Sequence, residues 1–61
     1  MNSRAKVLIA DAVRDITVLD MRSKGYIEPA GHHRTDGQVA SDALNSLTEL
    51  FEVLITESHD Q

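Results

Sequence analysis

Residues 39–55 read VASDALNSLTELFEVLI, and the spacing of the apolar side chains in this stretch decides the fold. Apolar residues recur three and four positions apart, which places them in one line along an α-helix. The line has the a/d spacing of a heptad and consists of Ala40, Ala43, Leu47, Leu50 and Leu54. Its neighbours are Leu44, Phe51 and Ile55 on one side and Val39 on the other. We therefore predict a helix over residues 36–57 with this line as its core-facing seam.

The start of this helix is indicated by Thr35 and Gln38. In a capping box the threonine hydroxyl accepts a hydrogen bond from the backbone N–H three residues later, and the glutamine side chain reaches back to the threonine N–H. The residues upstream contain the chain's single proline, Pro29, and show no apolar periodicity. We therefore predict a connecting loop over residues 25–35.

A second apolar line predicts another helix, over residues 4–24. Its members lie within an arc of about 140° and are Ala5, Leu8, Ile9, Ala12, Val13, Ile16 and Leu19. The β-branched residues in 7–9 and 16–19 would also suit strands, but strict alternation fails there. Ser3 is the predicted N-cap, and Gly25 stands where a helix-ending glycine belongs. Two helices and a short loop favour an antiparallel hairpin.

Both apolar arcs are wider than one hairpin can cover. A chain of 61 residues and 6.7 kDa buries only about 60% of its surface on folding, and this chain has no cysteine for a disulfide. We therefore predict one all-α domain, residues 1–61, in which two hairpins pack as a homodimeric four-helix bundle. The residues predicted to carry self-association are Leu47, Leu50, Phe51 and Leu54. The alternative is a monomer in which residues 26–36 pack as a lid.

The sequence lacks the motifs of several kinds of metal-binding, phosphate-binding and catalytic site. His32 and His33 are metal-ligand types, but no second histidine pair at helical spacing completes a zinc site, and His59 lies far along the chain. The three glycines are isolated, which excludes a phosphate-binding loop, and no serine has the G-x-S-x-G context. We therefore predict no enzymatic activity, no metal and no cofactor.

The composition and the apolar runs also predict where in the cell the protein is found. The apolar run at residues 7–10 ends at Asp11, too early for a secretory signal, and no apolar stretch approaches the length of a membrane span. Absence of cysteine is consistent with a reducing compartment. We therefore expect a soluble cytoplasmic protein without membrane contacts.

The charges are divided unevenly along the chain. All six Lys and Arg residues lie in the first 34 positions, whereas the remaining residues carry acids alone, and the net charge is −4. The basic residues of the first helix, Arg4 and Arg14 among them, provide one hypothesis, a small nucleic-acid-binding or transcription-associated dimer. The sequence pI of about 5.1 is opposite to the usual basic footprint of such proteins.

The favoured hypothesis is a protein-interaction module: an adaptor, regulator or inhibitor. The first helix carries apolar residues roughly opposite its predicted core face, and Val7 and Val18 align after nearly three turns. The predicted partner-binding residues are Val7, Arg14, Val18 and Met21. The acids of the second helix, Asp42, Glu49 and Glu52, either contact a basic partner or are simply solvated.

Overall fold

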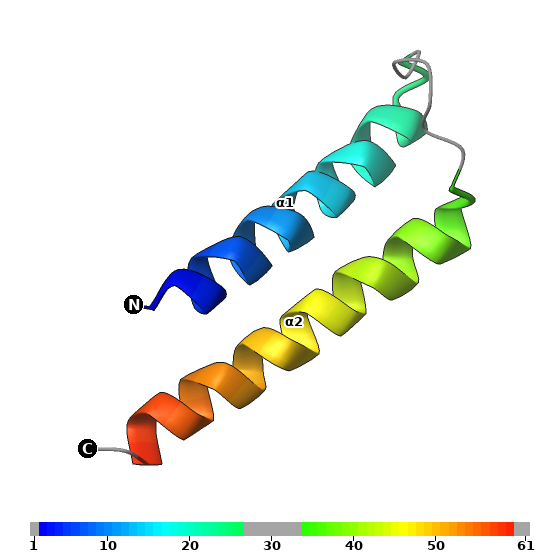
Figure 1. Cartoon of the computed structure of the whole chain (residues 1–61). Coiled ribbons are helices and arrows are strands. Elements are labelled where there is room, and N and C mark those ends of the chain that lie inside the picture. The colour runs from blue at the N-terminus through cyan, green and yellow to red at the C-terminus, as the bar shows by residue number, and fades with distance from the viewer. Residues whose placement is uncertain (1, 27–33, 60–61) are drawn as a thin grey trace.

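The computed structural model describes residues 2–26 and 34–59, which form two helices (Figure 1). Helix α1 spans Ser3–Ser23 and helix α2 spans Asp36–His59. They lie side by side and antiparallel, so that both chain ends are found at the same end of the molecule (Figure 1). No strand occurs in the described ranges. The predicted helical hairpin is therefore confirmed, and the helix bounds agree with those predicted to within two residues.

Different capping interactions end helix α1 at its two termini. Asn2, and not Ser3, is the N-cap, because its side-chain oxygen accepts a hydrogen bond from the Ala5 N–H at 2.8 Å. The prediction of Ser3 is wrong by one residue, since both side chains can cap and the first turn begins earlier. At the other end Gly25 has a φ of 80°, and its N–H donates to the Arg22 carbonyl at 3.0 Å. The predicted glycine stop is confirmed.

The predicted capping box at the start of α2 is also confirmed. The Thr35 N–H donates to Gln38 Oε1 at 2.9 Å, and the Gln38 N–H donates to Thr35 Oγ1 at 3.1 Å. Two donors that the helix itself leaves unpaired are thus satisfied locally. The start of α2 at Asp36 follows from these two side chains.

The core lies between the helices and is built from one row of residues on each, which we call the inner rows. The α1 row consists of Ala5, Leu8, Ala12, Asp15, Leu19 and Arg22. The α2 row consists of Val39, Ala43, Ser46, Leu50, Val53 and Glu57. Each row alternates steps of three and four residues, the spacing that keeps side chains on the contact line of two nearly parallel axes.

The rotation of α2 differs from the predicted one. Ala43 and Leu50 of the predicted seam do lie on the inner row, and Val39 is fully buried. Leu47 and Leu54, however, are 41% and 39% exposed. An apolar arc wider than the contact leaves this rotation open, because more than one line of the arc can turn apolar side chains toward α1.

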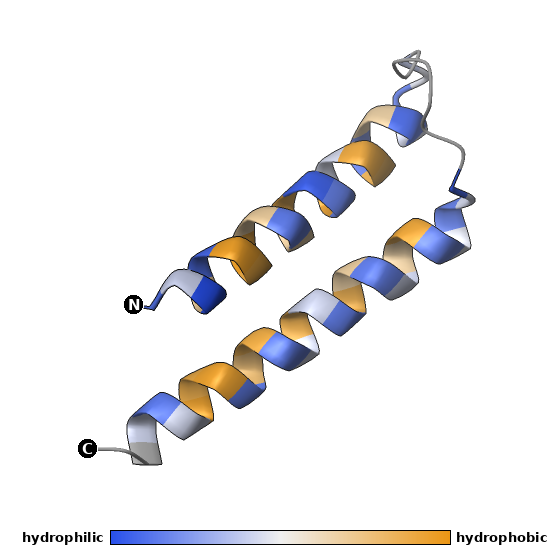
Figure 2. Ribbon diagram, in the orientation of Figure 1, coloured by the Kyte–Doolittle hydropathy of each residue, from blue (hydrophilic) through white to orange (hydrophobic). Residues whose placement is uncertain are grey.

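The residues that directly follow the inner-row positions are apolar in the middle of α1 and along most of α2. We call them the apolar face; they are Ile9, Val13, Ile16, Ala40, Leu44, Leu47, Phe51 and Leu54. Each residue turns a helix by about 100° in the same sense, so in an antiparallel pair these positions come to the same side of the hairpin. Figure 2 shows apolar residues recurring along the whole length of both helices.

The apolar face carries larger side chains than the core does. Among the described residues, the buried apolar ones are three alanines, Val39 and Leu8. By contrast Phe51 is 64% exposed, Leu44 63% and Val13 57%. The hairpin therefore buries its small side chains and leaves its bulky ones in contact with water.

Candidate interaction surfaces

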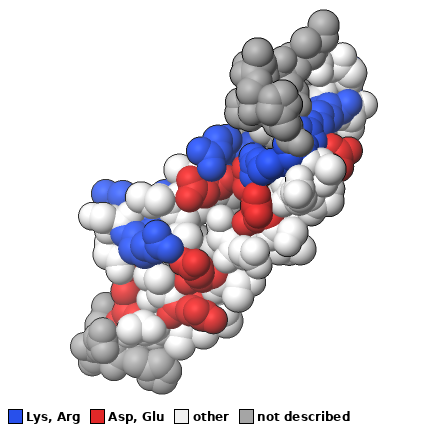
Figure 3. Space-filling model, turned by 45° about the vertical axis from the view of Figure 1, so that its right-hand side comes forward, with Lys and Arg blue, Asp and Glu red and all other residues white. Residues whose placement is uncertain are grey.

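The opposite side of the hairpin is formed by the residues that directly precede the inner-row positions. We call it the charged face, after its charged members: Arg4, Asp11, Arg14, Asp42, Glu49 and Glu52. Figure 3 shows basic and acidic side chains alternating along the seam between the helices. On this side Arg4 of α1 and Arg34, which precedes α2, come within contact distance of acids of α2.

The most deeply placed charge is the carboxylate of Asp15, a member of the α1 inner row that is only 2% exposed. Arg34, from the segment before α2, donates one hydrogen bond to Asp15 at 2.9 Å and another to Asp42 at 2.7 Å. The Arg14 Nε lies 3.8 Å from the same Asp15 oxygen. Through Arg34, Asp15 of α1 is thus linked to Asp42 of α2 and to the segment that precedes α2.

The two carboxylates have an electrostatic effect on Arg34. Its hydrogen bonds to Asp15 and then to Asp42 raise the pKa of the guanidinium above its ordinary value. A folded-state pKa that is raised gives stability below the unfolded pKa and loses it only when the pH passes the folded value. Both values lie far above neutrality, so Arg34 keeps its charge and its contacts throughout the usual pH range.

Neither Asp15 nor Arg34 was singled out in the sequence analysis. The signal was present, because Asp15 continues the three-and-four spacing of Ala5, Leu8 and Ala12. An aspartate in an apolar row is ordinarily a reason to end the row. Its partner Arg34 lies in the predicted loop, where no periodicity indicates a contact.

Two further ion pairs join the helices nearer their ends. Arg4 pairs with Glu49, and Arg22 Nη1 lies 2.6 Å from Asp36 Oδ1. These partners account for two of the basic residues on which the nucleic-acid hypothesis depended. The basic charge of α1 is therefore largely directed at acids of its own chain.

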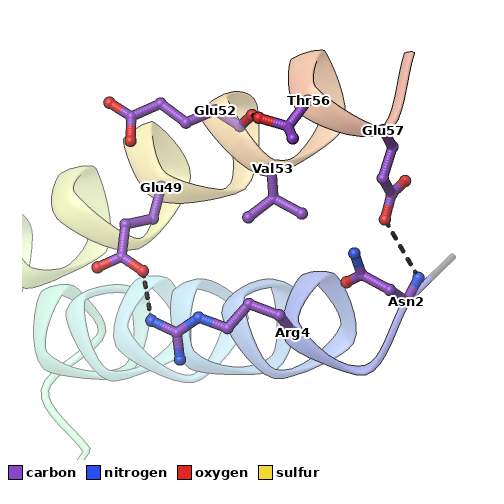
Figure 4. A pocket seen from close by; sticks show the side chains of 7 residues that line it. All are labelled: Asn2, Arg4, Glu49, Glu52, Val53, Thr56 and Glu57. Atoms are coloured by element: carbon purple, nitrogen blue, oxygen red, sulfur yellow. Dashed lines mark hydrogen bonds and ion pairs between the residues drawn. The ribbon is translucent and has the colours of Figure 1, made fainter. Parts of the chain in front are cut away.

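A groove of about 620 Å³ opens between the start of α1 and the end of α2 (Figure 4). Arg4 crosses toward Glu49, Val53 points toward α1, and Glu52 points away from it. The Asn2 N–H donates to Glu57 Oε1 at 3.4 Å. These contacts close the open end of the hairpin, and the Thr56 hydroxyl is itself engaged, donating to the Glu52 carbonyl at 2.9 Å.

The predicted partner-binding residues all lie along one side of α1, the side of the charged face. Val7 is 49% exposed and the Arg14 side chain 63% exposed. Val18 and Met21 are half-buried, so they flank the contact with α2 and do not lie opposite the core as predicted. The cause is that these positions directly precede inner-row residues, one helical step of about 100° from the core.

The predicted self-association residues are divided between two surfaces. Leu47, Phe51 and Leu54 lie on the apolar face, whereas Leu50 lies on the inner row and is half-buried against α1. Ile55, 41% exposed, adjoins the apolar face on its outer edge. The structure thus assembles three of the four residues on one exposed surface.

Other candidate features contribute no site. His32 and His33 lie outside the described residues, and the side chain of His59 is not described. Within residues 2–26 and 34–59, no three His, Cys, Asp or Glu side chains are grouped as metal ligands would be. Neither of the two described helices combines the length and apolarity needed to cross a bilayer. No protein-family model, curated protein or solved structure matches this chain.

Proposed function

We propose that this chain is a non-enzymatic protein-interaction module that works as a homodimer, with two hairpins packed into a four-helix bundle. The observation that carries the proposal is the apolar face. It is continuous across both helices, and the charged residues in its rows, Lys6 and Asp20, stand at the ends of the α1 row. It also holds the chain's single phenylalanine, Phe51, and three leucines, Leu44, Leu47 and Leu54.

The exposed area supports a contact of the size that a dimer needs. The chain exposes 4554 Å², whereas surface scaling gives about 3,900 Å² for a compact monomer of this mass. Stable protein interfaces bury about 800 Å² on each partner. Covering the apolar face would remove an area of this order from water.

A second copy is the occupant that the chain's own composition favours. The buried apolar residues of one hairpin are mostly alanines, which contribute little transfer free energy on burial. A face-to-face contact with an identical surface adds a second core of larger side chains such as Leu44 and Leu47. It also leaves both charged faces, with their internal ion pairs, on the outside of the bundle.

That outer side is where we propose that a different protein binds. Val7, Arg14, Val18 and Met21 form a mixed apolar and charged strip along the α1 side of the charged face. In the proposed dimer two such strips are displayed, one on each outer side. At this strip we propose that the chain acts as an adaptor, regulator or inhibitor through contacts with another protein.

Thermal unfolding at several protein concentrations tests the proposal. For a dimer the melting temperature rises with concentration, because dissociation is coupled to unfolding. A melting temperature that is independent of concentration over a hundredfold range would contradict it. Gel retardation of duplex DNA or RNA at low salt, abolished by Arg14→Glu, would favour the nucleic-acid hypothesis instead.

A further inference from the structure

The proposed dimer has two possible internal arrangements, and the hairpin itself distinguishes them. A twofold axis parallel to the helices places α1 of one copy against α2 of the other. A twofold axis across the helices places α1 against α1 and α2 against α2. The choice between them rests on the proposed homodimer. It follows from charge and from the level of each side chain, by which we mean its position along the helix axes.

The levels of opposed residues follow from contacts at the two ends of the hairpin. Asn2 contacts Glu57 near one end, and Arg22 contacts Asp36 near the other. Interpolation along the antiparallel helices at a common rise per residue therefore places Ile9 level with residue 50. By the same reasoning Ile16 is level with residue 42.

At these levels the apolar side chains of α1 stand opposite gaps in the α2 row. Ile9 lies between the levels of Leu47 and Phe51, and Ile16 between those of Ala40 and Leu44. A twofold axis parallel to the helices preserves every level, so the partner's α2 presents these same gaps to α1. Knobs then enter holes without any sliding of one copy past the other. Such interdigitation is the packing that helix pairs in bundles adopt.

Charge favours the same arrangement. In its described part α2 carries five acids and no Lys or Arg: Asp36, Asp42, Glu49, Glu52 and Glu57. Two α2 helices side by side would make neighbours of two helices that both carry net negative charge, which costs free energy even with the acids on the outer side. With α1 against the partner's α2, each acidic helix has α1 helices as both neighbours. At the two ends of the α1 row of the apolar face stand Lys6 and Asp20, one charge of each sign, so the charge argument rests on the acids of α2 alone.

We propose that the second copy is related by a twofold axis parallel to the helices, so that α1 packs against the partner's α2. In the bundle each α2 is flanked by α1 of its own chain and α1 of its partner. The apolar contacts across the interface are Ile9 with Leu47 and Phe51, and Ile16 with Ala40 and Leu44. The two α2 helices then lie on a diagonal and do not touch.

Cysteine cross-linking tests this arrangement directly, because the native chain has no cysteine. Three single variants are prepared, Ile9→Cys, Leu47→Cys and Phe51→Cys, each with and without an added tag. A tagged variant is mixed with an untagged one, and each mixture is then oxidised. We expect tagged–untagged cross-links between Ile9→Cys and Phe51→Cys. We expect neither self-linked Leu47→Cys nor a link between Leu47→Cys and Phe51→Cys. Glu52→Cys, on the charged face, is the unlinked control, and circular dichroism confirms that each variant folds.

The outcomes separate the arrangement from the dimer itself. Cross-links from Leu47→Cys to itself or to Phe51→Cys, without a link to Ile9→Cys, would overturn the arrangement and leave the proposed homodimer intact. Absence of all cross-links with a monomeric mass by light scattering would overturn both. Absence of all cross-links in a protein of dimeric mass would overturn the arrangement alone.

Discussion

The charged face and the apolar face lie one helical step on either side of the same inner rows. Charges on the first are paired within the chain, whereas apolar side chains on the second stay exposed. On the charged face Arg4 contacts a carboxylate of the same chain, and so do Arg22 of the inner row and Arg34 before α2. On the apolar face Leu44 and Phe51 are more than half exposed and have no covering element in the described structure. A small chain can satisfy its charges by itself, but it cannot bury its bulky apolar groups.

The comparison also explains the rotation of α2. Turning α2 so that Leu47 and Leu54 faced α1 would bury more apolar area within one chain. It would also carry Asp42 and Glu49 away from Arg34 and Arg4, and would leave the buried Asp15 without the partner that links it to α2. The observed rotation keeps the ion pairs and leaves the apolar face for a second molecule.

The largest expected effect is from a charge placed on the apolar face. Leu47→Asp would bury an unpaired carboxylate in the proposed interface, and we expect the dimer to weaken at least about 100-fold. Because the single hairpin has a small core, helicity at micromolar concentration should fall as well. Light scattering and circular dichroism measure these two quantities.

The matched control is Asn45→Asp, which adds the same charge two residues away on the charged face. Asn45 is exposed, so the dimer should keep its mass and its helicity. Equal weakening by both substitutions would show that the two faces do not differ as described.

The next largest effect should come from Asp15→Ala, which removes the buried carboxylate and leaves Arg34 with Asp42 alone. We expect the melting temperature to fall by roughly 5–10 °C, since breaking a buried ion pair is strongly destabilising. Asp20→Ala, which removes an exposed acid paired with Lys24 at 2.9 Å, should change it by about 2 °C. If the two falls were equal, the described role of Asp15 would be wrong.

Overpacking of the inner rows should have an intermediate effect. Ala12 is 2% exposed, so Ala12→Leu forces the helices apart and should cost about 1–3 kcal/mol of unfolding free energy. Ala10→Leu, two residues away at an exposed position, should stay within about 0.5 kcal/mol. Urea titration followed by circular dichroism compares the two, and an unaffected Ala12→Leu would indicate a looser core than the structure shows.

The smallest effect belongs to the exposed pair between Arg4 and Glu49. Both side chains are more than half exposed, so Arg4→Ala should lower the unfolding free energy by no more than about 1 kcal/mol. The difference should shrink further in 1 M salt, which screens exposed charges. A large loss that persists in high salt would mean that this pair fixes the end of the hairpin.

Much of the fold could be predicted because it follows from local rules. The capping box of Thr35 and Gln38 and the left-handed Gly25 depend on neighbouring residues, and each had the signal that its chemistry requires. The choice of Asn2 over Ser3 as the N-cap could not be made, since adjacent residues of equal capping ability leave the first turn undecided.

The surfaces were harder to predict because they depend on contacts across the chain. The apolar residues of α2 span an arc that permits several rotations, and the acids that select one of them find their partners in α1 and before α2. Asp15 was not predicted as a core residue, because a lone aspartate is ordinarily exposed. Leu47, Phe51 and Leu54 lie on one surface, to which helical spacing brings them, whereas Leu50, predicted with them, lies on the inner row.

The central claim is that the apolar face is covered by a second copy of the chain. Sedimentation equilibrium of the native protein at micromolar concentration measures this most directly. We predict a mass about twice the 6.7 kDa of one chain, with full helicity retained. A stably helical protein that sediments as a single chain would contradict the account.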